Sequence, residues 1–271
     1  MKIEDWKRSM NTIESLKKKK VVGEKLTCLT AYDASFAQIL DEAGVDIILV
    51  GDSLGMVIQG KETTLPVTVD EMVYHASAVK LGAPEAFIVV DMPFMSYKSP
   101  DDALINAGDL MKKSGANMVK LEGGKNQLDT VKKLSNFGIP VCAHLGLLPQ
   151  SVHKTSGYRV QGKEENDANV LFDEALSLQN SGADMLVLEC VPANLAKRIS
   201  ESLDIPVIGI GAGADCDGQV LVLYDILAIS KGKRPKFSKD FLAGQDSILD
   251  ALKSYVNAVK ISEFPAAEHS F

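Results

Sequence analysis

Eight short apolar runs are spread along the chain, and nearly all of them end in a polar residue or a glycine cluster. The stretches between the runs have helical periodicity. Eight alternations of a buried strand and a helix in one domain-sized chain are typical of an α/β fold of the (β/α)₈ (TIM) barrel type. The runs occupy residues 25–33, 45–53, 86–93, 117–124, 139–146, 184–192, 205–213 and 225–232.

Size and composition agree with a single barrel. The chain has 271 residues, of which 46% are hydrophobic, so we expect residues 1–271 to form one domain around one core. Helical spacing predicts an extra amphipathic helix over 5–19, and we expect segment 1–24 to pack on the bottom of the barrel. The run Lys17–Lys20 would be a solvated helix end that complements the helix dipole. The residues that set the spacing are Trp6, Met10, Ile13 and Leu16.

Capping signals mark several of the other helices. Thr68 and Glu71 form a T-x-x-E capping box, and Ser99 stands before a proline and two aspartates. Gly44 and Gly115 stand where helices are expected to end. The predicted helices cover about residues 34–43, 68–82, 99–115, 126–136, 166–181, 193–202, 215–223 and 246–262.

Charge and hydropathy exclude several classes of function. The net charge of −7 argues against a nucleic-acid partner. No stretch approaches the roughly 20 apolar residues of a membrane span, and the first 20 residues lack the apolar segment of a signal peptide. The four cysteines are scattered without a C-x-x-C motif, which predicts neither a zinc site nor a disulfide framework. We therefore expect a cytoplasmic protein that acts on small molecules.

Two connections are longer than a barrel needs. They are residues 53–67, after the second strand, and 147–165, after the fifth. Both are rich in glycine and small polar residues. Loops of this length are usually functional or disordered, and these two follow strands that end in polar residues. We interpret them as lids over the site.

Polar side chains gather at the carboxyl ends of the predicted strands, where barrels of this type carry their chemistry. Residues two apart in a strand share a face. Each of these polar side chains therefore lies on the same face as apolar residues earlier in its strand, and it is the last of them, at the mouth of the barrel. The residues are Asp52, Asp91, Lys120, Glu122, His144 and Glu189.

Three of these carboxylates would repel one another unless a cation compensates for them. Oxygen ligands suit a hard ion, so we predict Mg²⁺, with Asp52 and Asp91 as direct ligands and Glu122 as a third, direct or through water. Each single carboxylate has an alternative interpretation as a helix cap or a lysine partner. Three at matching positions make that interpretation weaker.

The remaining strand-end residues leave alternatives open. Lys120 could neutralise a substrate carboxylate, form a Schiff base, or simply pair with a neighbouring carboxylate. Glu189 is available for general acid–base work. His144 could bind substrate oxygens or be a satisfied core histidine. The glycines of segment 209–213 indicate close approach of the backbone to a flat ligand or to a neighbouring loop.

Long segments of the chain resemble the ketopantoate hydroxymethyltransferase (3-methyl-2-oxobutanoate hydroxymethyltransferase) family over about residues 25–271. They include LTAYDASFA, VGDSLGMVIQG, DMPFMSY, GANMVKLEGG, PVCAHLGLLPQSV, LVLECVP, IPVIGIGAG and the terminal EHSF. The resemblance implies a (β/α)₈ barrel that is commonly a homodecamer in bacteria. It also implies transfer of a one-carbon unit from 5,10-methylenetetrahydrofolate to 3-methyl-2-oxobutanoate, giving 2-dehydropantoate in pantothenate synthesis.

The resemblance also implies roles for individual residues. Asp52 and Asp91 match the Mg²⁺ ligands of the family, and Glu122 matches its third metal-associated carboxylate. Ser53 and Lys120 match residues that hold the keto acid, and Glu189 of LECVP matches the proton acceptor. With His144 as a further substrate contact, these residues form the candidate site.

Two other functions compete with this one. A Mg²⁺-dependent carbon–carbon lyase of the isocitrate-lyase type also uses a barrel and an enolate, but its K-K-C-G-H loop motif is absent from the sequence. A non-catalytic barrel that senses a metabolite would carry a degraded site, whereas every candidate residue here is intact.

Overall fold

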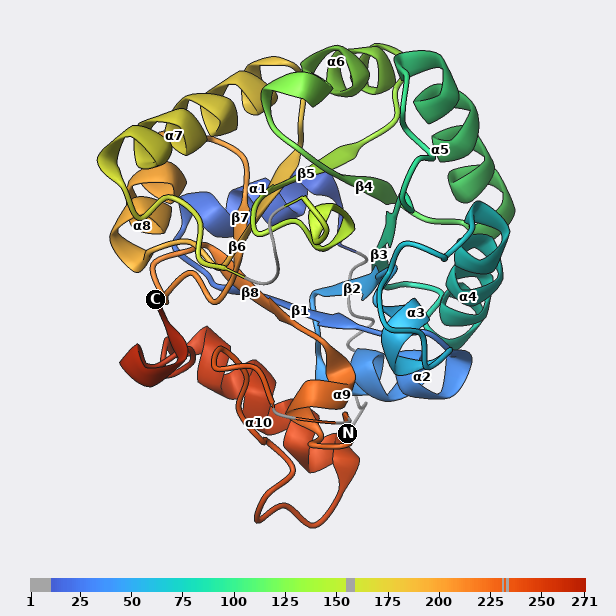
Figure 1. Cartoon of the computed structure of the whole chain (residues 1–271). Coiled ribbons are helices and arrows are strands. Elements are labelled where there is room, and N and C mark those ends of the chain that lie inside the picture. The colour runs from blue at the N-terminus through green and yellow to red at the C-terminus, as the bar shows by residue number, and fades with distance from the viewer. Residues whose placement is uncertain (1–10, 155–158, 231, 233) are drawn as a thin grey trace, which may run out of the picture.

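The computed structural model describes residues 11–154, 159–230, 232 and 234–271. Eight parallel strands form a closed barrel in sequence order, and helices surround it (Figure 1), so the predicted (β/α)₈ barrel is confirmed. The strands are β1 Leu26–Thr30, β2 Ile47–Val50, β3 Phe87–Asp91, β4 Met118–Glu122, β5 Val141–Gly146, β6 Met185–Glu189, β7 Val207–Ile210 and β8 Gly218–Leu221.

The capping signals place most helix ends correctly. Thr68 and Glu71 form both hydrogen bonds of the capping box, and Ser99 caps its helix. Gly44 and Gly115 end their helices in the left-handed conformation. The helices are α1 Ile13–Val21, α2 Ala34–Ala43, α3 Leu54–Val57, α4 Val69–Gly82, α5 Pro100–Ser114, α6 Leu128–Asn136, α7 Glu165–Asn180, α8 Ala193–Ser202, α9 Leu223–Ile226 and α10 Ile248–Lys260, with 3₁₀ turns η1 Lys125–Gln127, η2 Pro149–Ser151 and η3 Ala267–His269.

The prediction was wrong at the eighth strand. β8 lies inside the stretch 215–223 that was expected to be helical, and the apolar run predicted as a strand at 225–232 begins within α9. The connection from β7 to β8 is a short turn over 211–217 without a helix. β8 shows little apolar signal because it begins with Gly218, where an added Cβ would lie 2.6 Å from the Leu26 carbonyl oxygen, and continues with the buried Gln219.

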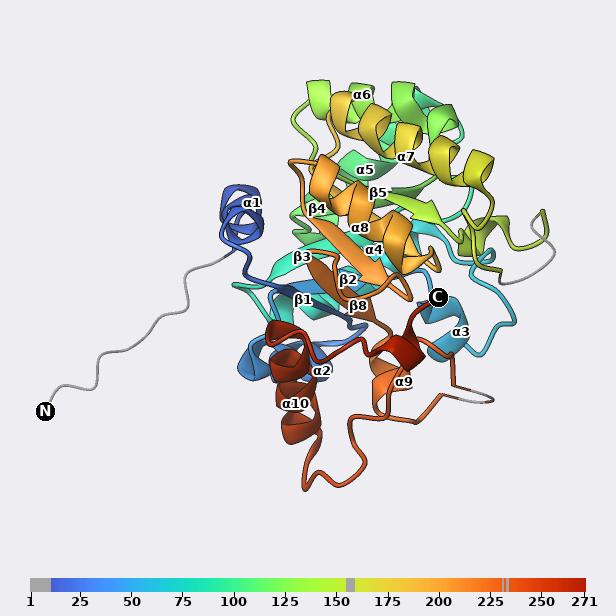
Figure 2. The same ribbon diagram turned by 90° about the vertical axis from the view of Figure 1, so that its left-hand side faces the viewer.

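Helix α1 lies at the amino-terminal ends of the strands, opposite α3 (Figure 2). The helix predicted over 5–19 begins only at Ile13, where Thr12 caps it, and extends to Val21; Leu16 is fully buried, and Trp6 and Met10 lie outside the described residues. The lysine run lies in the last turn of α1, as expected for a run that complements the helix dipole, but the expectation that it is solvated was wrong, because three of its lysines bind aspartates that directly precede strands. The pairs are Lys17–Asp184 at 3.2 Å, Lys19–Asp46 at 2.6 Å and Lys20–Asp217 at 2.6 Å. In the part of the chain that the structure describes, no helix is long and apolar enough to cross a membrane.

Asp46 is the most buried of these aspartates and joins four elements. Its carboxylate accepts hydrogen bonds of 2.9 Å from the backbone and the side chain of Thr27. It also forms ion pairs with Lys19 and, at 2.8 Å, with Lys260 of α10. Burial opposes ionisation, but Lys260 and the other donors outweigh it and lower the pKa of Asp46. The folded state therefore stabilises the charged carboxylate.

We expect Asp46→Asn to lower the free energy of unfolding by about 2–4 kcal/mol at pH 7, because both lysines lose their buried partner and keep only the more exposed Glu24. Because the pKa of Asp46 is lower in the folded state, its carboxylate stabilises the fold fully above the unfolded pKa of about 3.9. This stabilisation is lost as the pH falls through the folded pKa. The difference between variant and wild type should therefore shrink below about pH 4. Urea denaturation at several pH values measures it. Exposed Asp129→Asn, as the control, should change stability by no more than about 0.5 kcal/mol.

Candidate active site

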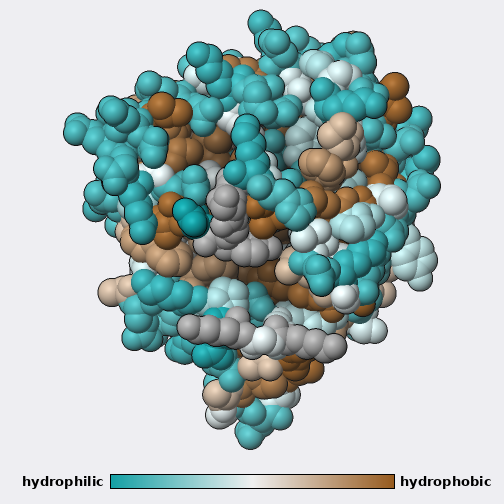
Figure 3. Space-filling view, viewed as in Figure 1, coloured by the Kyte–Doolittle hydropathy of each residue, from teal (hydrophilic) through white to brown (hydrophobic). Residues whose placement is uncertain are grey.

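The register of the parallel strands brings the predicted residues together in pairs. Asp91 is the direct neighbour of Lys120 across β3 and β4, and Glu122 is the direct neighbour of His144 across β4 and β5. Seen toward the barrel, hydrophobic residues gather in a hollow that crosses an otherwise mostly hydrophilic face (Figure 3).

The centre of the site is the ion pair between Lys120 and Asp91. Lys120 Nζ lies 2.7 Å from Asp91 Oδ1, and both side chains are buried. The other oxygen of Asp91 accepts a hydrogen bond of 3.1 Å from the Asp52 backbone N–H. Burial opposes the charge on Lys120, but Asp91, Glu122 and Asp52 outweigh it and raise the pKa of the ammonium. Of the alternatives for Lys120, the pairing with a neighbouring carboxylate is therefore present.

The environment of Asp52 disfavours its ionised form. Burial, followed by the charges of Asp91 and Glu122, raises the pKa of Asp52 well above its ordinary value. One hydrogen bond of 2.8 Å, from Gln150 Nε2 to Asp52 Oδ2, partly compensates. Three buried carboxylates thus share one ammonium, so the site favours a further cation.

Ser53 follows Asp52 at the start of α3 and is half-buried. Its hydroxyl lies 2.9 Å from the hydroxyl of Tyr32, and it caps no helix N–H. A Cβ at Gly51 would lie 2.7 Å from Ser53 Oγ and 3.5 Å from Asp91 Oδ2. A glycine is thus needed where the chain folds back beside both side chains.

His144 stands between two carboxylates. Its Nε2 lies 3.3 Å from Glu189 Oε2, and its Nδ1 lies 3.7 Å from Glu122 Oε1. Among the described residues, neither ring nitrogen has a hydrogen bond of good geometry, so His144 is not a satisfied core histidine. Burial and Lys120 act to lower the pKa of His144, but Glu122 and Glu189 outweigh them and raise it. Glu189 is thus in contact with His144 rather than isolated.

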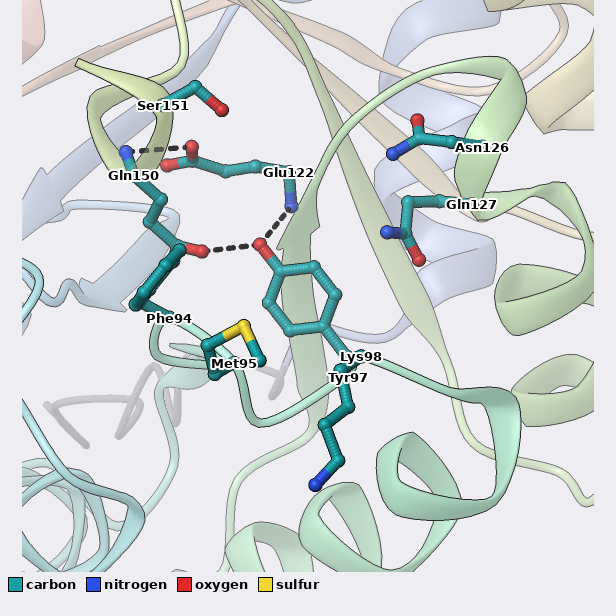
Figure 4. Close-up of a pocket in the computed structure, with 9 residues that line it drawn as sticks. All are labelled: Phe94, Met95, Tyr97, Lys98, Glu122, Asn126, Gln127, Gln150 and Ser151. Atoms are coloured by element: carbon teal, nitrogen blue, oxygen red, sulfur yellow. Dashed lines mark hydrogen bonds between the residues drawn. The ribbon is translucent and has the colours of Figure 1, made fainter. Parts of the chain in front are cut away.

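Two residues of the site were missed in the sequence. Gln150, in η2, donates from its backbone to Glu122 Oε2 at 3.1 Å and from its side chain to the Met92 carbonyl at 3.0 Å. Tyr97 donates its hydroxyl proton to Gln150 Oε1 and accepts from the Glu122 backbone N–H at 3.3 Å (Figure 4). Both lie on loops outside the strand periodicity. Their only signals were the polar loop 147–165 and the motif DMPFMSY.

The glycines of segment 209–213 pack against the chain itself. A Cβ at Gly209 would lie 2.9 Å from Cys216 Sγ, and one at Gly211 would lie 3.1 Å from Phe237 and Phe271. Of the two alternatives, the structure therefore shows close approach to neighbouring segments.

The donor set suits a hard cation. Among the residues that the structure describes, no three of His, Cys, Asp and Glu lie close enough together to enclose an ion. Mg²⁺ is commonly held by one or two carboxylates, with water and substrate oxygens completing the octahedron. Asp52 and Asp91, linked through the backbone, fit this arrangement.

Solved structures share the fold at low sequence identity. A 2,3-dimethylmalate lyase of the PEP mutase/isocitrate lyase superfamily matches with a TM-score of 0.58 and 16% identity, over 94% of this chain and 98% of that one. A phosphonopyruvate hydrolase in complex with oxalate and Mg²⁺ matches with a TM-score of 0.59 and 10% identity, over 90% and 95%. The likeness is one of fold.

Sequence relatives are much nearer. A 3-methyl-2-oxobutanoate hydroxymethyltransferase of Nitrosococcus oceani is 59% identical over 96% of this chain and 98% of its own length. A protein of Hahella chejuensis, 3-methyl-2-oxobutanoate hydroxymethyltransferase 2, is 56% identical over 97% and 98%. The family model described as ketopantoate hydroxymethyltransferase matches residues 10–267. The chain belongs to the ketopantoate hydroxymethyltransferase family.

Proposed function

We propose that this enzyme transfers a one-carbon unit from 5,10-methylenetetrahydrofolate to C3 of 3-methyl-2-oxobutanoate, with Mg²⁺ held by Asp52 and Asp91. The observation that carries the proposal is the crowding of three buried carboxylates around the single ammonium of Lys120. In the overall reaction C3 loses a proton and gains a carbon–carbon bond, water supplies the hydroxyl, and tetrahydrofolate leaves.

The metal is the cation that this site favours. When bound, Mg²⁺ supplies positive charge that polarises the keto group and makes the adjacent C–H more acidic. Asp52 and Asp91 would hold it directly, and Glu122 through water. The Mg²⁺ in the phosphonopyruvate hydrolase of the same fold supports this choice.

Lys120 would bind the carboxylate of the keto acid. Its ammonium is held by Asp91 at 2.7 Å and is kept protonated by the surrounding carboxylates. A protonated amine is a poor nucleophile, which argues against a Schiff base. The hydroxyl of Ser53, next to Asp52 in the chain, would donate to the same substrate.

Glu189 and His144 would handle protons. Their contact of 3.3 Å allows His144 to pass a proton to or from Glu189, and Glu122 lies on the other side of the ring. We assign Glu189 to proton transfer in the folate-dependent step because it is the one carboxylate of the site that the metal would not need.

The proposal is tested by product formation from both substrates with and without Mg²⁺. Chelator should abolish the activity and Mg²⁺ should restore it. Asp52→Asn should weaken Mg²⁺ binding, measured by calorimetry, by at least ~100-fold, since it loses a charged ligand. Asp129→Asn, on the surface, should bind as wild type does. Full turnover by metal-free enzyme would refute the metal assignment.

For Lys120 we expect the alanine variant to raise the KM for the keto acid by about 10- to 100-fold, the effect of losing a charge-assisted contact. Lys112→Ala, an exposed lysine, is the control. Borohydride added to wild-type enzyme and substrate should leave the mass of the protein unchanged. An adduct at Lys120 would show Schiff-base chemistry instead.

For Glu189 we expect the isosteric Gln variant to lower kcat by about 10² to 10⁴ while Mg²⁺ affinity stays nearly constant. Deuterium exchange at C3 of the keto acid should survive better than transfer. Equal losses of exchange and transfer would make Glu189 the base that removes the C3 proton. If neither exchange nor transfer slows in the variant, Glu189 takes no part in the chemistry.

A further inference from the structure

A pocket of about 170 Å³ adjoins the site on the side of Glu122. It lies between the loop after β3, the turn η1 after β4, and η2 (Figure 4). Tyr97 and Gln150 form part of its wall, and they are joined by a hydrogen bond. Because Gln150 Nε2 binds Asp52, one side chain separates the pocket from Asp52.

One side of the pocket is apolar. Phe94 is 43% exposed and Met95 is 56% exposed, although both are large hydrophobic residues. Met95 has a φ of +66°, a conformation that costs a residue other than glycine about 1–3 kcal/mol and that recurs at ligand clamps. Together they offer a surface on which a flat ring can stack.

The opposite side carries amides. Asn126 and Gln127 line the pocket, and their amide nitrogens are turned toward Glu122 and Tyr97 (Figure 4). Gln127 Oε1 is buried and has no hydrogen-bond partner among the described residues. This oxygen points away from Glu122 and Tyr97, whereas the amide NH₂ groups of Asn126 and Gln127 can donate to acceptor atoms of a ligand. Lys98 also lines the pocket; its side chain is 58% exposed and its ammonium lies 4.0 Å from Asp102 Oδ2.

We propose that this pocket holds the pterin ring of the one-carbon donor, an inference that rests on the function proposed above. A pterin is flat, presents N–H donors and acceptors along one edge, and is carried on a molecule that ends in carboxylates. The volume is below the ~300–1,000 Å³ of sites that enclose a whole drug-sized ligand, and it suits one ring system. The anionic tail would leave past Lys98.

The placement explains how donor and acceptor meet. The keto acid would lie on the Asp52 side of Gln150 and the ring on the Tyr97 side. Gln150 contacts both compartments, so a turn of its side chain opens the path between them. Its amide is held by hydrogen bonds alone, which break at a lower cost than an ion pair would.

The test compares Phe94→Ala and Gln127→Leu with wild type, using tetrahydrofolate as the ligand in calorimetry. Each substitution should weaken tetrahydrofolate binding and raise the KM for the methylene-folate donor about tenfold, since it removes the stacking surface or an amide donor. The KM for the keto acid should stay within about twofold of wild type, which also shows that the variants are folded. Phe137→Ala, an exposed phenylalanine outside the pocket, should leave every constant unchanged.

The outcomes separate the two proposals. If the wild-type enzyme turns over and the variants bind tetrahydrofolate as tightly as wild type, the pterin pocket is overturned and the proposed function stands. Equal rises in both KM values would also overturn it, because they indicate a general distortion of the site. Wild-type enzyme that neither binds tetrahydrofolate nor uses its methylene derivative overturns the pocket together with the proposed donor.

Discussion

The ion pair between Lys120 and Asp91 organises the mouth of the barrel. Strand register sets it, since the two residues are direct neighbours on β3 and β4. The second oxygen of Asp91 holds the backbone of Asp52, and the carboxylate of Asp52 holds Gln150 on a distant loop. Gln150 in turn binds Tyr97. Loss of the single ammonium would leave an uncompensated buried charge and would loosen every member of this chain of contacts.

The parts of the site that lie on strands could be predicted from the sequence, because alternation along a strand and the common carboxyl edge of a parallel barrel are local rules. Lys120 and Glu122 share a face for that reason. Tyr97 and Gln150 follow no such rule. They reach the site from loops, and their bonds to Glu122 span 25 and 28 residues. The same limit explains why the eighth strand was missed. Gly218 and Gln219 pair with residues of β1 and β7, but neither residue is part of an apolar pattern.

The lysines of α1 show where a local electrostatic argument falls short. Complementing the helix dipole is sufficient reason for basic residues in a last turn, and it applies here. It says nothing of tertiary partners, and Lys17 and Lys20 pair with aspartates 167 and 197 residues away in the chain. The helix is therefore bound to the barrel by ion pairs as well as by the buried Leu16.

The two ends of the barrel use the same residue types in opposite ways. At the amino-terminal end each strand-leading aspartate pairs with at least one lysine, so Asp46, Asp184 and Asp217 are compensated within the folded chain. At the carboxyl end Asp52, Asp91 and Glu122 share Lys120, and burial raises the pKa of Asp52. Compensated pairs stabilise a structure without a ligand, whereas an uncompensated group gains its stabilisation only when a cation or a proton arrives. The unequal distribution of lysines therefore assigns stability to one end and binding to the other.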